Sequence, residues 1–217
     1  MEFDELANLI KSRRSIRSWQ KKEVPEELLL KAIELATWAP NGGNEQNWYF
    51  YIITKRDTIN SLADVVQSSA EKIASWPEAA QASDFARRML ERVSIFRNAP
   101  VIIVVTTAQY QSPIDKVLSA REKVDAWATQ TRQWRNTVDT RIQSVSSGIA
   151  YLLLILHQMG LGALWMTGPM QAKGEIEKIL KIPDGVDAVA VIPVGYPAEN
   201  PEPPNRKPVQ EVCKIIS

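Results

Sequence analysis

The stretch Val101-Ile102-Ile103-Val104-Val105 lies between Pro100 and the pair Thr106-Thr107, and every one of its residues is apolar and β-branched. A short run that is apolar at every position is typical of a β-strand buried on both faces, because a strand with one solvated face alternates apolar and polar residues. The stretch therefore predicts a strand inside the hydrophobic core of the chain.

Helices and further strands are expected on both sides of this strand. Asp4 can cap a first helix, and Val24-Pro25-Glu26-Glu27 is typical of a second helix start. The other expected elements are helices over 58–73, 83–96, 138–159 and 171–180 and strands over 48–54 and 188–194. Because the elements interleave without a repeat or a flexible linker, we expect a single mixed α/β domain over residues 1–217.

The composition is that of an ordinary globular chain of 217 residues, with 45% hydrophobic and 24% charged residues. The net charge of +1 provides no overall attraction to nucleic acid or anionic lipid. One cysteine, Cys213, and one histidine, His157, leave neither an internal disulfide nor a Cys/His metal set. We therefore expect no metal, no nucleic acid and no membrane partner, and, with no apolar leader at the N-terminus, a cytoplasmic location.

Three cations and a hydroxyl occur together in Arg13-Arg14-Ser15-Ile16-Arg17. Guanidinium groups match phosphate oxygens bidentately, and serine adds a neutral donor. In an extended segment, the side chain of Arg14 points away from those of Arg13 and Arg17, so a phosphate could be held at one end. Taken alone, such a pentad is more often a solvated basic turn.

Three further segments have the composition of ligand-binding loops. The loop Ala39–Trp48 contains two glycines, which allow close approach to the backbone, and Asn and Gln amides that suit a heterocycle. Trp165–Pro169 could direct a backbone N–H at a ligand, and Arg206-Lys207 could clamp a phosphate. An ordinary loop, a tight connection and a solvated pair are the respective alternatives.

In this order along the chain, these segments resemble the FMN-dependent nitroreductase family. The resemblance includes the apolar helix that ends in Gly160-Leu161-Gly162 and the stretch Val191–Pro197 followed by Arg206-Lys207-Pro208. It covers nearly the whole chain apart from residues 68–98 and 110–138, which in relatives form a variable lid over the flavin.

The resemblance implies an FMN site formed by both ends of the chain and a central loop. Arg13, Arg14 and Ser15 match residues that hold the phosphate and ribityl chain, and Arg17 matches a basic residue at the pyrimidine edge. The full implied set of cofactor-binding residues is Arg13, Arg14, Ser15, Arg17, Pro40, Asn41, Gly42, Asn44, Gln46, Thr167, Gly168, Arg206 and Lys207.

The implied fold is an α+β, three-layer sandwich with a small mixed β-sheet flanked by helices. The implied assembly is a homodimer in which the C-terminal arm embraces the other subunit. The loop that begins at Pro40 reaches the cofactor from the partner, and residues 1–10 and the helix over 138–159 supply much of the dimer face.

The implied chemistry is ping-pong hydride transfer from NADH or NADPH through flavin N5 to a nitroaromatic or quinone-like small molecule. Such chemistry has no obligatory protein acid or base, so we expect no catalytic side chain. His157 is expected only to interact with the helix dipole or with solvent.

Departures from the family pattern leave the substrate class open. Asn47 stands where many relatives have proline, and Ala150-Tyr151 stands where a Gln-Asn pair is common. The alternatives are a reductive dehalogenase, an enzyme that fragments its own reduced FMN with oxygen, and a flavin-binding protein without turnover. Tyr110, Trp127 and Trp134 are expected near the lid, although packing against the dimer core is favoured for them.

Overall fold

The computed structural model describes residues 2–81, 84–109 and 112–216. Its centre is a four-stranded sheet in the order β1-β2-β4-β3, in which neighbouring strands run antiparallel. The strands are β1 (Trp48–Ile53), β2 (Val101–Ala108), β3 (Gly162–Ala163) and β4 (Val186–Gly195). The strand predicted from the run Val101–Val105 is confirmed as β2, and all five residues of that run are buried.

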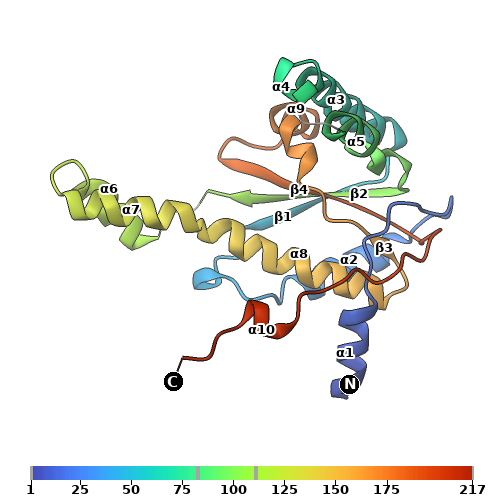
Figure 1. The fold of residues 1–217 in the computed structure, drawn as a ribbon, viewed down its shortest axis with the longest axis horizontal. Helices are drawn as coiled ribbons and strands as arrows, with labels where there is room; N and C mark the ends of the chain where they lie inside the picture. The colour runs from blue at the N-terminus through green and yellow to red at the C-terminus, as the bar shows by residue number, and fades with distance from the viewer. Residues whose placement is uncertain (1, 82–83, 110–111, 217) are drawn as a thin grey trace.

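Helices cover both faces of the sheet and give the expected three layers (Figure 1). One layer contains α2 (Glu26–Ala36) and α8 (Thr140–Gln158), and the other contains α3 (Arg56–Ala74), α4 (Pro77–Gln81), α5 (Phe85–Arg92) and α9 (Lys173–Leu180). Because successive strand residues point to opposite faces, Ile103 packs with the first layer and Ile102 with the second. The predicted α+β sandwich is confirmed.

The four strands pair antiparallel, and among the described residues the only parallel pairing, the component expected of a mixed sheet, is an isolated bridge between Ser15 and Ala163. This bridge adds the segment after the first helix to the edge of the sheet beside β3. The two-residue strand β3 was not predicted, because Gly162 and Ala163 are too few to produce a strand pattern.

Two predicted helix boundaries differ from the structure. The helix expected over 83–96 is divided into α5 and the short 3₁₀ helix η2 (Ile95–Asn98), and α9 is preceded by η3 (Gly168–Ala172). Asp4 is not the cap of α1 (Phe3–Ser12): the cap is Glu2, which exchanges hydrogen bonds with Glu5 in a capping box.

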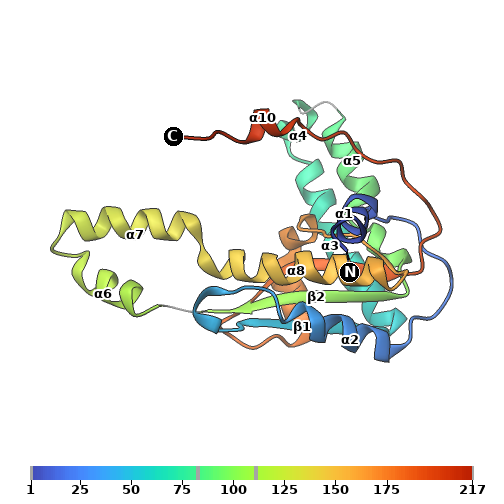
Figure 2. The same cartoon turned by 90° about the horizontal axis from the view of Figure 1, so that it is seen from below.

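Three segments project from the sandwich. The hairpin of α6 (Pro113–Arg121) and α7 (Ala126–Val138) extends beyond the end of the sheet, and α1 packs against the other end of α8 (Figure 1 and Figure 2). The C-terminal tail runs away from the layers and carries only α10 (Val209–Val212). Within the described ranges, no helix is long and apolar enough to cross a membrane.

Candidate functional site

Three arginines from the two ends of the chain approach one another beside the end of α1. Arg13 immediately follows α1, Arg14 is next to it, and Arg206 comes from the C-terminal tail. Burial, and then the positive charges of Arg14 and Arg206, lower the pKa of the Arg13 guanidinium. Cations that approach without a counter-charge destabilise one another, so a bound anion would stabilise the group. We call these three residues the cation cluster.

Carboxylates do not neutralise the cation cluster. In the part of the chain that the structure describes, no ion pair includes Arg13, Arg14 or Arg206. The Arg14 side chain instead donates to the carbonyl oxygens of Lys11 at 2.6 Å, Arg13 at 2.9 Å and Pro201 at 3.2 Å. Carbonyl oxygens orient this guanidinium but leave its net charge in place.

The segment after α1 is held in an extended form at the sheet edge. The Ile16 amide donates to the carbonyl of Ala163 at 3.1 Å, and the Trp19 indole donates to the carbonyl of Gly162 at 3.0 Å. A glycine is needed at position 162, because a Cβ there would lie 2.7 Å from Cγ1 of Ile16. The segment therefore has the extended conformation that was considered above for a phosphate site.

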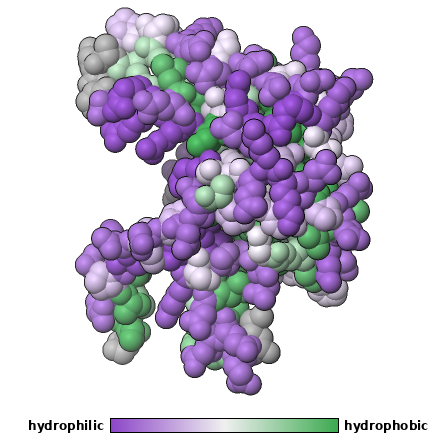
Figure 3. Space-filling model, turned by 90° about the vertical axis from the view of Figure 1, so that its right-hand side faces the viewer, coloured by the Kyte–Doolittle hydropathy of each residue, from purple (hydrophilic) through white to green (hydrophobic). Residues whose placement is uncertain are grey.

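The start of the tail pairs with this extended segment. The carboxylate of Glu199 accepts hydrogen bonds from the backbone amides of Arg17 and Ser18, the latter at 3.1 Å. The amide of Ala198 donates to the carbonyl of Ser18 at 2.9 Å. Figure 3 shows a mostly hydrophilic surface on this side of the molecule, with hydrophobic residues in separate patches.

Arg17 and Lys207 are less constrained than the cation cluster. The exposed Arg17 guanidinium donates to the carbonyl of Ser15 at 3.2 Å. Lys207 is exposed, and no hydrogen bond or ion pair of its side chain is found within the described ranges. Both side chains are exposed, and the proposal that either contacts a ligand remains a prediction.

The loop expected to contact a heterocycle is tightly folded over the first half of α8. The amide of Gly42 donates to Oγ of Ser144 at 3.1 Å, and the hydroxyl of Ser147 donates to the carbonyl of Pro40 at 2.6 Å. The Oδ1 of Asn41 accepts from the amide of Gln46 at 3.0 Å. Sequence reasoning missed the two serines, although their spacing of three on a helix places them on one face.

Positive φ angles give this loop its shape. Gly43 has a φ of 63°, Asn44 of 53° and Gln46 of 47°. Glycine and asparagine tolerate this left-handed region, which accounts for their presence in the loop. The amide side chain of Asn47 donates to Oγ1 of Thr107 at 3.0 Å, so the residue that replaces the common proline joins the loop to β2.

The structure does not bring this loop and the cation cluster together within one chain. The loop contacts α8 at Ser144 and Ser147, whereas the cation cluster lies near His157 at the other end of the same helix. Ten helical residues between Ser147 and His157 span about 15 Å. Within one chain, the loop and the cation cluster therefore lie beside different parts of α8.

Thr167 and Gly168 lie at the start of η3 and are both exposed. The neighbouring Met166 exchanges backbone hydrogen bonds with Val191 at 3.0 and 2.9 Å, which fixes the segment on β4. Thr167 is four residues beyond Ala163, the partner of Ser15, and four residues of extended chain span at most about 14 Å. The sheet edge thus places these residues near the extended segment.

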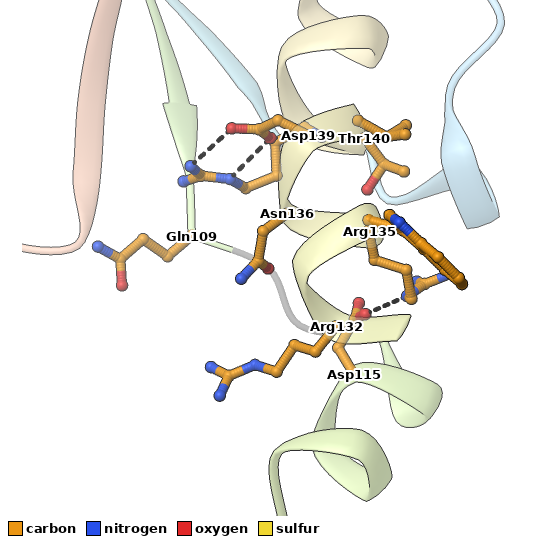
Figure 4. A pocket seen from close by; sticks show the side chains of 10 residues that line it. Gln109, Asp115, Arg132, Arg135, Asn136, Asp139 and Thr140 are labelled. Carbon is orange, nitrogen blue, oxygen red and sulfur yellow. Dashed lines mark hydrogen bonds and ion pairs between the residues drawn. The ribbon is translucent and has the colours of Figure 1, made fainter. Parts of the chain in front are cut away.

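Two hollows in the surface lie elsewhere and contain none of the predicted site residues. One, of about 550 Å³, lies where α7 meets α8 (Figure 4). Its arginines are paired with acids: Arg135 with Asp115, Arg132 with Glu122, and Arg141 with Asp139 and Asp187. Because its cations are neutralised, it lacks the anion-attracting property of the cation cluster.

The other hollow, of about 450 Å³, lies between α3 and α9 and includes Lys72, Trp76 and Glu175. Of the expected lid aromatics, Trp134 lines the first hollow, and Trp127 lines neither hollow. Trp127 and Trp134 are 69% and 61% exposed on the projecting α7, and their packing against a dimer core stays a prediction. Tyr110 lies outside the described residues.

The expectation that His157 interacts only with the helix dipole or with solvent is incomplete, because the half-buried ring also contacts a side chain of α1. Its Nε2 lies 2.9 Å from Oγ of Ser12. Burial, and then the charges of Arg13 and Arg14, lower the pKa of His157. The sequence could not reveal this neighbourhood, because it depends on how α1 packs against the end of α8.

Comparison with known proteins gives this arrangement a context. The model of the nitroreductase family matches residues 10–196. A protein of Methanothermobacter thermautotrophicus, described as a candidate NADH dehydrogenase/NAD(P)H nitroreductase, is 31% identical over 195 residues, which cover 88% of this chain and 77% of that protein.

Solved structures share the fold over the whole chain. A BluB-like flavoprotein from Clostridium difficile 630 has a TM-score of 0.85 at 30% identity, with 100% of both chains covered. An iodotyrosine deiodinase, solved with FMN and 3-iodo-L-tyrosine bound, has a TM-score of 0.71 at 22% identity, with 98% of this chain and 97% of that chain covered. At that identity the second likeness concerns the fold alone.

Proposed function

The chain belongs to the nitroreductase family, and on that premise we propose that it is an FMN-dependent oxidoreductase. It takes electrons from NADH or NADPH and passes them to a nitroaromatic or quinone-like acceptor. When bound, FMN supplies the hydride chemistry, and the protein supplies binding, orientation and charge.

The observation that carries this proposal is the unneutralised cation cluster. FMN ends in a phosphate monoester with a charge near −2 at neutral pH, and arginine forks bind such groups bidentately. Burial, and then the positive charges of Arg14 and Arg206, lower the pKa of Arg13. A phosphate would relieve this repulsion, so the residues present fit the cofactor.

Arg17 is proposed to act at the other end of the cofactor. Glu199 fixes its backbone, while its guanidinium stays exposed and positively charged. Reduction of a flavin places negative charge on its pyrimidine ring, and a fixed cation nearby stabilises that charge. Thr167 and Gly168 are proposed to orient the flavin edge through their backbone, with no side chain acting as acid or base.

A homodimer is proposed because one chain does not complete the site. The loop around Asn41 and the cation cluster lie at opposite ends of α8, so the loop is proposed to come from the partner. Apolar side chains without partners support this: Phe3 and Ile10 on α1 and Ile215 in the tail are exposed. Light scattering should give twice the 24.4 kDa of one chain.

Reductive dehalogenation is the second candidate, because a deiodinase solved with FMN and 3-iodo-L-tyrosine shares the fold. The departures at Asn47 and Tyr151 and the exposed aromatic residues of α7 leave the acceptor site unlike the common family pattern. Both candidate functions use FMN bound at the same cation cluster. The acceptor that reoxidises the reduced flavin therefore distinguishes them.

The acceptor experiment reduces the FMN-loaded protein with NADPH under nitrogen and then adds one acceptor at a time. We expect menadione or nitrofurazone to reoxidise the flavin and to sustain NADPH consumption. Reoxidation by 3-iodo-L-tyrosine, with iodide release and no response to the other two, would favour the second candidate. A reduced flavin that no acceptor reoxidises would contradict both.

A further inference from the structure

We propose that His157 is a positioning residue of the phosphate site: it takes up a proton from solvent when a phosphate monoester binds at the cation cluster, and so tightens that binding. The inference rests on the proposed function, because it takes the phosphate of FMN as the ligand. It adds a group that acts through its charge and through Ser12, without a direct contact to the reacting atoms.

The position of His157 is fixed by α1. Its Nε2 lies 2.9 Å from Oγ of Ser12, and that hydroxyl also donates to the carbonyl of Leu9 at 3.2 Å. The contact fixes the place of the ring, and the tautomer decides whether Nε2 donates to this hydroxyl or accepts from it. Protonation of the second ring nitrogen gives the imidazolium, in which Nε2–H donates to Oγ of Ser12.

The charges around His157 are of one sign. Arg13 and Arg14 face it from the segment after α1, and Arg206 of the tail reaches Arg13. No carboxylate in the described ranges pairs with any of these groups. Without ligand, burial and these arginines hold the pKa of His157 below its usual value, so the ring is neutral at pH 7.

A bound phosphate changes this balance. Its two negative charges offset Arg13 and Arg14 and favour the charged imidazolium, so the pKa of His157 rises in the complex. The complex then holds more protons than the free protein between the two pKa values. By linkage, His157 tightens phosphate binding as pH falls through this window and contributes nothing above it.

FMN itself complicates a plain pH profile. Its phosphate loses a charge as pH falls below a pKa of about 6, which weakens binding in the opposite direction. A His157→Gln variant keeps a hydrogen-bonding amide beside Ser12 but cannot titrate in this range. Both proteins bind the same ligand at a given pH. Dividing the dissociation constant of the variant by that of the parent therefore removes the effect of the titration of the FMN phosphate.

The single histidine allows a direct test. The ¹H and ¹³C signals of the imidazole are followed from pH 5 to pH 8 in the free protein, with saturating FMN, and with riboflavin, which lacks the phosphate. We expect a higher pKa for His157 with FMN than in the free protein, and no such rise with riboflavin. Equal pKa values with and without bound FMN, or an equal rise with riboflavin, would overturn the inference.

The matching binding experiment measures FMN affinity by fluorescence quenching at pH 5.5 and pH 8. The dissociation constant of the His157→Gln variant divided by that of the parent should be near one at pH 8. This ratio should rise at pH 5.5, by up to about tenfold for each unit by which the pKa of His157 in the complex exceeds that in the free protein. Gln158→Ala, an exposed neighbour on α8, should give a ratio near one at both pH values. A ratio for His157→Gln that does not change with pH would contradict the role.

These outcomes separate the inference from the proposed function. FMN that binds tightly while His157 stays unresponsive leaves the proposed oxidoreductase intact and removes only the role of His157. Failure of FMN to bind the parent protein at any pH would remove both.

Discussion

The Nε atom of Arg14 donates a hydrogen bond to the carbonyl oxygen of Pro201 at 3.2 Å, and so joins the N-terminal arginines to the C-terminal tail within one chain. Glu199 and Ala198 hold the same stretch of tail on the backbone of Arg17 and Ser18. Residues 202–216, which follow these contacts along the chain, are all exposed. The tail beyond Pro201 is therefore the segment proposed to act as an arm toward a partner subunit.

Removing a member of the cation cluster should weaken FMN binding. Arg13→Ala or Arg206→Ala should each cost about 1.5–3 kcal/mol, the range for a hydrogen bond to a charged group, which is about 10- to 150-fold in the dissociation constant. Fluorescence titration of the apoprotein with FMN measures this loss directly.

Arg87→Ala is the matched control for both substitutions. Arg87 is an exposed arginine on α5 that pairs with Asp84 and Glu91, away from the cation cluster. Its removal changes the net charge equally but should leave FMN affinity unchanged. If all three variants lose the same affinity, net charge rather than the cation cluster holds the cofactor.

Arg17→Ala should lower the reduction potential of bound FMN and largely spare its affinity. The exposed guanidinium is proposed to stabilise the negative charge of the reduced flavin, which a neutral side chain cannot do. Potentiometric titration compares the variant with the parent, and Arg17→Lys, which keeps the charge, should retain most of the parent potential. Equal potentials in Arg17→Ala and the parent would remove this role.

Gly162→Ala should displace the extended segment from the sheet edge. The added Cβ would meet Ile16 at 2.7 Å, and Ile16 is buried, so the backbone must shift. We expect a loss of about 1–3 kcal/mol in the free energy of unfolding, the range for overpacking, together with weaker FMN binding.

Gly174→Ala provides the comparison for this prediction. Gly174 lies in α9, and an added Cβ there would have nothing within 4 Å. Alanine in a helix interior is more stable than glycine by about 0.5–1 kcal/mol, so this variant should gain stability. A Gly162→Ala protein as stable as Gly174→Ala would show that the edge tolerates a side chain.

Ser144→Ala should loosen the loop over α8. The Oγ of Ser144 is buried and accepts from the Gly42 amide at 3.1 Å, so its removal leaves that amide without this partner. Because Gly42 is exposed and water can replace the serine, urea denaturation should show a loss of about 0.5–1.5 kcal/mol in the free energy of unfolding. Ser146→Ala, two residues further along α8, should show no comparable loss, and an equal loss in both variants would contradict the contact.

The layers of the fold were predictable because local patterns produce them. The apolar β-branched run Val101–Val105 predicted the buried strand, and the apolar helix over 138–159 corresponds closely to α8. The edge of the sheet was not predictable in the same way. Gly162 and Ala163 form β3 only because Ser15 and Gly195 lie beside them, and such long-range pairing leaves no periodic pattern in the sequence.

The candidate site residues came from the family resemblance, and their neighbourhoods could not be predicted from the sequence. The arginine pentad alone is more typical of a solvated turn, and the structure places the charges of Arg13 and Arg206 close enough to interact. The proximity of His157 to this cluster depends on the packing of α1 against α8, which no local pattern encodes. The role of each residue toward FMN remains a prediction, because it depends on a second chain and a ligand.

An absorption spectrum of the purified protein, loaded with FMN and then treated with NADPH without oxygen, tests the central claim most directly. The account predicts that the protein retains bound FMN through gel filtration and therefore shows a flavin spectrum. That spectrum should bleach when NADPH is added. A protein that retains no flavin after incubation with FMN would contradict the cofactor assignment. A bound flavin that neither NADPH nor NADH bleaches would contradict the oxidoreductase.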